Sequence, residues 1–183
     1  MADDTDLLDS VLTKTAALVD GAAGSPPSTP TPNPGMDLGA LLEHMATQVT
    51  SFATAAEGGT PDGETRPAGT PAEVFGVGAQ RAATAFRNGA GERTLTLGSQ
   101  LPGSAVLGMM LMEYIGHGWD VAQATGQTVA YTDAEAERGL ETGQAMLTPE
   151  YRGPESFAAE VAVPDGASAL DRLLGFMGRD PGR

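Results

Sequence analysis

Apolar residues recur at helical spacing along most of this chain, and prolines and glycines divide the pattern into segments. The spacing predicts helices over residues 4–20, 37–52, 71–86, 104–126, 132–147 and 167–177. Residues 93–97 alternate polar and apolar side chains, which predicts a short extended segment, and residues 157–163 are a second candidate. Aromatic residues make up only 5% of the chain, which disfavours an aromatic-rich β-sandwich. The sequence therefore predicts an all-α protein.

A proline-rich segment separates the first two predicted helices. Five prolines fall within residues 25–35, and each ring removes a backbone donor and biases the preceding residue toward extended geometry. Because neither side of this segment looks like a complete domain by itself, we expect a crossover over about residues 24–35 inside one domain spanning residues 1–183.

The composition excludes several classes of function. Ten basic residues against 24 acidic ones give a net charge of −14, and a field of that sign repels phosphate backbones, so nucleic acid is not an expected partner. The chain has no cysteine, which rules out disulfides, thiolate metal sites and a cysteine nucleophile. The first residues lack the features of a secretory signal, and no apolar run approaches the roughly 20 residues needed to span a bilayer. We expect a cytoplasmic protein without a membrane partner.

The chain contains only two histidines, and both can serve as metal ligands. Glu113 precedes His117 by four residues, so the two side chains share one helical face and can bind one ion. His44 lies on a different predicted helix and is the other imidazole available. Two imidazoles and a carboxylate suffice for a catalytic zinc site with an open position, and also for non-haem iron. Zinc is the first candidate, and nickel, iron, cobalt and manganese remain compatible.

A second interpretation of these residues needs no metal: His117 can be a core histidine with satisfied hydrogen bonds, and Glu113 can extend its carboxylate toward solvent. Burial favours the metal. Val106 and Met110 precede Glu113 on roughly the same helical face, and no lysine or arginine occurs in residues 94–131. A buried carboxylate there needs a partner from elsewhere.

Four other residues are candidates for the surroundings of the site. Asp120 follows His117 by three residues, so it can accept a hydrogen bond that orients the imidazole, or can simply be solvated. Met36, Met110 and Tyr114 are candidates for a pocket wall. The methionines of residues 104–126 are also typical of ordinary core packing, and Tyr114 is a packing residue that could instead hydrogen-bond to a group on the metal.

Two motifs resemble the DinB-like metal-binding superfamily. They are PTPNPGMDLGALLEH at residues 30–44 and EYIGHGWDVA at residues 113–122, and the terminal LLGFMGRDP at residues 173–181 adds to the likeness. The branch they resemble most is related to the N-terminal domain of mycothiol-dependent maleylpyruvate isomerase. The resemblance implies a four-helix bundle with a long crossover, here with extra C-terminal helices. It also implies that His44, Glu113 and His117 are the metal ligands.

The resemblance has one local departure. Family members usually carry cysteine and tryptophan where this chain has Asn33 and Met36. Without the indole, the wall just before the second helix is expected to be softer and roomier, which would fit a different substrate.

The function that the resemblance implies is that of a divalent-metal enzyme. Such an enzyme activates a thiol or water for attack on a small molecule, and a low-molecular-weight thiol such as mycothiol is the expected cofactor. Thiol transfer or isomerisation is the expected reaction class, although the longer isomerases have a C-terminal domain that this chain lacks, which argues against their particular isomerisation. The alternatives are a non-catalytic metal-binding or small-ligand-binding helical protein, and a homodimer in which the ion only staples the bundle.

Overall fold

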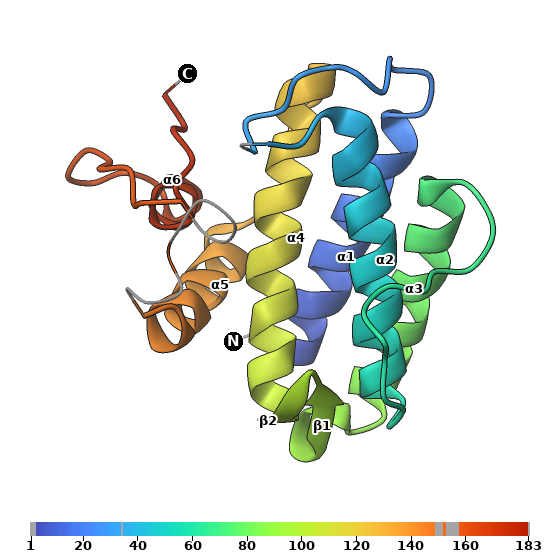
Figure 1. Cartoon of the computed structure of the whole chain (residues 1–183). Coiled ribbons are helices and arrows are strands. Elements are labelled where there is room, and N and C mark those ends of the chain that lie inside the picture. The colour runs from blue at the N-terminus through green and yellow to red at the C-terminus, as the bar shows by residue number, and fades with distance from the viewer. Residues whose placement is uncertain (1–2, 34, 149–151, 153–157, 183) are drawn as a thin grey trace.

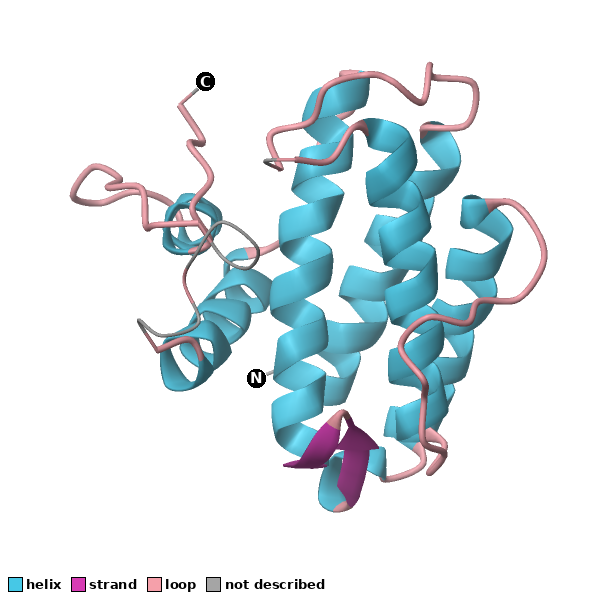
Figure 2. Cartoon of the chain, in the orientation of Figure 1, coloured by secondary structure: helices cyan, strands magenta, loops and turns pink. Residues whose placement is uncertain are grey.

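The computed structural model describes residues 3–33, 35–148, 152 and 158–182. These residues are mostly helical, and the only strands among them form one hairpin (Figure 2). The helices are α1 (Asp4–Gly21), α2 (Leu38–Ala56), α3 (Pro71–Arg87), α4 (Gly103–Thr125), α5 (Asp133–Met146), α6 (Ala169–Phe176) and the short 3₁₀ helix η1 (Ala90–Glu92). The strands are β1 (Thr94–Leu97) and β2 (Ser99–Pro102). The prediction of an all-α protein is confirmed.

The first four long helices form the bundle (Figure 1). Helices α3 and α4 each contact both α1 and α2, which closes a four-helix arrangement around a shared apolar core. The proline-rich connection from α1 to α2 runs across one end of this bundle (Figure 1). The fold is therefore consistent with the DinB-like bundle that the resemblance implied, and it contains the crossover that the prolines predicted.

The helix starts follow from side chains that bind free backbone amides. Asp37 accepts a hydrogen bond from the amide of Ala40 at the start of α2. Thr132 and Glu135 form a capping box at α5, and Thr70 with Glu73 forms a second one at α3. Each such cap contributes about 1 kcal/mol to helix stability.

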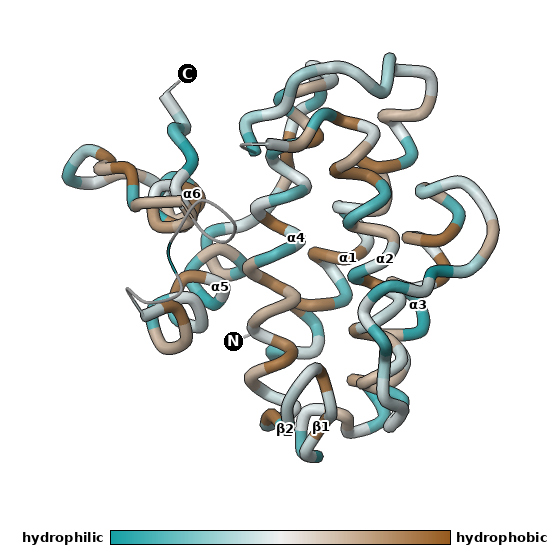
Figure 3. Tube along the Cα trace, in the orientation of Figure 1, coloured by the Kyte–Doolittle hydropathy of each residue, from teal (hydrophilic) through white to brown (hydrophobic). Residues whose placement is uncertain are grey.

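Helix α4 is buried along nearly its whole length, because the bundle covers one side and the C-terminal helices cover the other. Figure 3 shows the hydropathy of each residue along the Cα trace, with apolar and polar residues interspersed within the helices. Glycines in α4 allow α5 and the loop before it to pack closely against this helix. A Cβ on Gly108 would lie 2.0 Å from Thr142 Oγ1 of α5, and one on Gly118 would lie 1.9 Å from the Tyr131 hydroxyl. Side chains at these positions would therefore push α5 and its leading loop away from α4.

Two extended segments differ from the predictions. Residues 99–102, for which the sequence pattern predicts no strand, form β2, which pairs antiparallel with β1 and places Leu101 opposite Leu95. The tight reversal is possible because Gly98 adopts a φ of +71°. Residues 158–163 form no strand; Val161 instead donates its amide to the carbonyl of Gly175 at the end of α6. The remaining residue of that predicted segment, Phe157, lies outside the described residues.

In the part of the chain that the structure describes, no helix combines the length and the apolar character that a membrane span requires.

Candidate metal centre

The three residues predicted as ligands come together between α2 and α4. His44 projects from the middle of α2, whereas Glu113 and His117 lie one turn apart on α4. One ligand atom from each residue can be chosen so that all three lie within 4.8 Å of one another. The two imidazole rings meet edge to face, with their centroids 5.1 Å apart. The convergence depends on the packing of two helices that are distant in sequence.

The donor set and its spacing fit one divalent cation. Three donors bound tetrahedrally at about 2.0 Å from a zinc ion would lie about 3.3 Å from one another. Glu113 Oε2 already lies 3.2 Å from His117 Nε2, and the ligand atoms of all three residues lie within 4.8 Å of one another. Imidazole nitrogen and carboxylate oxygen are ligands that suit zinc, nickel, iron and cobalt alike.

The two histidines have opposite tendencies to hold a proton. Burial disfavours the imidazolium form of His117, but hydrogen bonds to Asp120 and Glu113 outweigh it and raise its pKa to about 9. Burial lowers the pKa of His44, and the neighbouring His117 lowers it further. Burial opposes the ionised form of Glu113 as well, but the hydrogen bond from His117 brings its pKa below the usual value. The site is thus a carboxylate, a neutral imidazole and an imidazole whose proton a cation must displace.

Asp120 holds the other nitrogen of His117. Its Oδ2 lies 3.3 Å from His117 Nδ1, and the aspartate side chain is fully buried. Burial alone would raise the pKa of Asp120, but the hydrogen bonds from His117 and Arg179 lower it, so the carboxylate accepts the Nδ1 proton. That hydrogen bond leaves Nε2 directed toward Glu113, where a cation would displace its proton.

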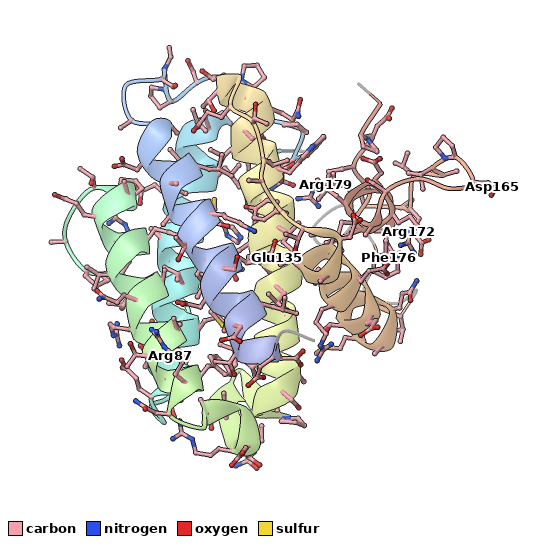
Figure 4. All side chains as sticks on the ribbon, turned by 180° about the vertical axis from the view of Figure 1, so that it is seen from behind. Arg87, Glu135, Asp165, Arg172, Phe176 and Arg179 are labelled. Carbon is pink, nitrogen blue, oxygen red and sulfur yellow. The ribbon has the colours of Figure 1, made fainter. Side chains whose placement is uncertain are left out.

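Arg179 is the residue at this site that the sequence analysis missed. It donates from Nη2 to Asp120 Oδ2 at 2.8 Å and from Nε to Asp120 Oδ1 at 3.3 Å. Figure 4 shows Arg179 in the C-terminal segment, on the side that faces α4. Because residues 94–131 contain no lysine or arginine, a buried acid in this stretch needs a basic partner from elsewhere in the chain. The arginine of the terminal GRDP motif could have been proposed as that partner.

The proposed pocket residues lie in different surroundings. Met110 is fully buried in the core, and Tyr114 packs edge to face against Phe52 and Phe75. The Tyr114 hydroxyl is buried and, among the described residues, has no hydrogen-bond partner. Met36 is half-buried and its sulfur accepts a hydrogen bond from the side-chain Nδ2 of Asn33 at 3.4 Å.

A cavity of about 300 Å³ opens next to Glu113. Its walls come from α2, α4, β1 and the loop before α3, and its other lining residues are Gln48, Ser51, Phe52, Gly63, Leu97 and Met109. Met110 and Tyr114 do not belong to this lining, whereas the neighbouring Met109 does. A mostly apolar space therefore borders one of the three candidate ligands.

Comparisons with known proteins place the chain in a family. Residues 8–122 match the model of the mycothiol maleylpyruvate isomerase N-terminal domain. Two uncharacterized proteins from strains of Mycobacterium tuberculosis are 33% identical to the chain over 81 residues, which is 44% of this chain and 44% of each relative. No solved structure matches. Because the family model covers more than half of the chain, including all three candidate ligands, the protein belongs to the mycothiol maleylpyruvate isomerase N-terminal domain family.

Proposed function

We propose that this protein is a mononuclear divalent-metal enzyme that activates a thiol or water for reaction with a small molecule. The observation that supports it most is the convergence of His44, Glu113 and His117, whose ligand atoms lie within 4.8 Å of one another. Three protein ligands leave an open coordination position, as catalytic sites require. Membership of the family supports the same assignment.

Each group of the protein has a distinct role in this proposal. A divalent cation at the site would lower the pKa of a thiol or water at its open position and polarise a substrate carbonyl. His44, Glu113 and His117 hold the cation, and Asp120 fixes the orientation of His117. The cavity beside Glu113 accommodates a small apolar group of the substrate.

The nucleophile in this proposal is a small-molecule thiol such as mycothiol. The chain has no cysteine, so any thiol must be brought by a cofactor or substrate, and the name of the family points to mycothiol. In a thiol transfer, the sulfur forms a bond to the substrate carbon as the leaving group departs with the electrons of its own bond. The thiol proton passes to solvent through the opening at Glu113. Zinc, nickel, iron, cobalt and manganese are all compatible ions.

Metal content and turnover test the proposal together. Elemental analysis of freshly purified protein should give about one divalent metal per chain, and His117→Ala should lose the metal while keeping its helical circular dichroism spectrum. Glu43→Gln is a matched control, because Glu43 neighbours His44 but lies exposed and pairs with Arg66. A folded wild-type protein that binds no divalent metal would overturn the proposal.

The alternative is a metal-binding protein without catalysis. Asp120 favours this alternative, because its ion pair with Arg179 prevents it from exchanging a proton with a substrate. Assays with a set of small thiols and electrophilic substrates distinguish the two functions. Thiol-dependent turnover that disappears on chelation and returns with metal supports the enzyme, whereas turnover that persists after complete removal of the metal excludes metal catalysis.

A further inference from the structure

The C-terminal segment reaches the candidate metal centre from beyond the residues that the family model matches. The family match ends at residue 122, but α5, α6 and the residues around them cover the outer side of α4. Met177 packs against Gly116, where a Cβ would lie 2.5 Å from the methionine methyl group. This close packing lets the chain after α6 approach the turn of α4 that carries His117.

Hydrogen bonds hold both the backbone and the guanidinium group of Arg179. Its backbone amide donates to the carbonyl of Leu174 at 2.9 Å, and its Nη1 donates to the carbonyl of Met177 at 3.0 Å. The rest of the guanidinium faces Asp120, and only 6% of the arginine side chain is exposed. A two-point ion pair of this kind fixes geometry as well as charge.

One oxygen atom connects this ion pair to a candidate ligand. Asp120 Oδ2 accepts from Arg179 Nη2 at 2.8 Å and lies 3.3 Å from His117 Nδ1. On the other side of the imidazole ring, Nε2 lies 3.2 Å from Glu113 Oε2. Any displacement of Arg179 therefore frees the carboxylate that sets the rotation of the ring.

We propose that Arg179 is a positioning residue of the candidate metal centre, and that cation binding and docking of residues 158–182 stabilise each other. This rests on the proposed metal site. Arg179 holds Asp120, and Asp120 holds the ring of His117 so that Nε2 faces the cation. Because such coupling is reciprocal, a docked segment raises the affinity for the cation by the same factor by which the cation favours docking.

Variants of Arg179 test the first half of the proposal in the full-length protein. Arg179→Met removes the ion pair, and Arg179→Lys keeps the charge but not the two-point geometry. Arg172→Met is the matched control, since Arg172 lies in the same segment and pairs with Glu137 on the exposed surface. Loss of groups that orient metal ligands weakens binding by about 10- to 100-fold. We expect Zn²⁺ affinity to fall about tenfold in Arg179→Met, less in Arg179→Lys, and not at all in the control.

Binding of Co²⁺ distinguishes a positioning role of Arg179 from a purely structural one. Its visible absorption spectrum reports ligand geometry, and it should change in Arg179→Met but not in Arg172→Met. A variant that unfolds more easily yet binds Zn²⁺ as tightly as wild type, with an unchanged Co²⁺ spectrum, would show that Arg179 only stabilises the fold and would overturn the proposal.

Hydrogen exchange of the wild-type protein tests the second half without any variant, and decides the question if Arg179→Met does not fold. The reporter amides are Val161, which donates to Gly175, and Arg179, which donates to Leu174. A tenfold coupling predicts that saturating Zn²⁺ slows their exchange about tenfold. Unchanged exchange in a protein that binds Zn²⁺ contradicts the coupling but leaves the metal site intact, whereas a wild-type protein that does not bind Zn²⁺ contradicts the proposed function itself.

Discussion

The imidazole rings of His44 and His117 lie at 85° to each other with centroids 5.1 Å apart, although they come from different helices. Their pKa values shift in opposite directions, because burial dominates at His44 whereas two carboxylates outweigh it at His117. At neutral pH the pair therefore offers one free nitrogen lone pair and one protonated ring. This asymmetry determines how metal binding must depend on pH.

Metal binding should release about one proton at pH 7.5, and that proton comes from His117. Its pKa of about 9 lies above the pH, so a cation must displace the proton, whereas His44 is already neutral. The affinity for Zn²⁺ should consequently rise about tenfold per pH unit until the pH reaches about 9. Calorimetric titration in buffers of different ionisation enthalpy measures the number of protons. Release of two protons, or none, would contradict this assignment of charges.

Removing the metal should lower thermal stability. A ligand present at about 1,000 times its Kd stabilises the folded state by about 4 kcal/mol, and each kcal/mol shifts the Tm of a chain of this size by about 2–4 °C. Excess Zn²⁺ should thus raise the Tm of the metal-free protein by about 8–16 °C. Glu113→Gln should abolish most of this shift, and Glu43→Gln should retain it in full. An equal shift in both variants would mean that Zn²⁺ stabilises the protein at another place.

The buried Tyr114 and the partly buried Tyr131 should respond differently to loss of the hydroxyl. Tyr114→Phe removes a hydroxyl that has no partner in the described structure, so the free energy of unfolding should stay constant or rise by up to about 1 kcal/mol. Tyr131→Phe removes hydrogen bonds to the Tyr114 carbonyl at 3.0 Å and to Thr15 Oγ1 at 2.8 Å. That change should cost about 1 kcal/mol in urea unfolding.

Turnover of the Tyr114→Phe variant adds a second result to this comparison. A folded variant that binds metal normally but loses activity would show that the hydroxyl reaches a group on the metal during the reaction. Unchanged turnover would leave Tyr114 as a packing residue between Phe52 and Phe75, in agreement with its ring contacts.

Glu135 should make the protein sensitive to acid. It accepts from Lys14 Nζ at 2.7 Å and from the amide of Thr132 at 2.7 Å, which links α1 to the start of α5 (Figure 4). Burial opposes its charged form, but these hydrogen bonds outweigh burial and lower its pKa below 4.5. A depressed pKa in the folded state means that the contribution to stability is present above pH 4.5 and is lost as the pH falls through the folded value.

Replacing this carboxylate measures its contribution. Glu135→Gln should lower the free energy of unfolding by about 2 kcal/mol at pH 7 and by less at pH 3, since the same carboxylate in the unfolded wild-type chain is protonated below about pH 4.5. Glu137→Gln is the control, because Glu137 lies on the same helix in an exposed ion pair, which contributes less than about 1 kcal/mol. A loss in Glu135→Gln that is as large at pH 3 as at pH 7 would refute the electrostatic explanation.

Much of the secondary structure was readable because its causes are local. Helix periodicity and the prolines before α2 predicted where the helices lie, and the caps at Asp37 and Thr132 reinforce two of the helix starts, since caps and ring constraints act over a few residues. The hairpin was predicted only in part. Residues 99–102 have no strong strand pattern of their own, and they become β2 because they pair with β1 across Gly98.

The sequence by itself determined the chemistry available to the site: two imidazoles, no thiol, and a carboxylate one turn from His117. Helix geometry alone placed Glu113 and Asp120 on either side of that imidazole. Only the tertiary structure decided that His44 lies opposite them and that Arg179 neutralises Asp120, because these contacts join residues far apart along the chain. Their formation depends on the packing of α2 and the C-terminal segment against α4, which no local pattern encodes.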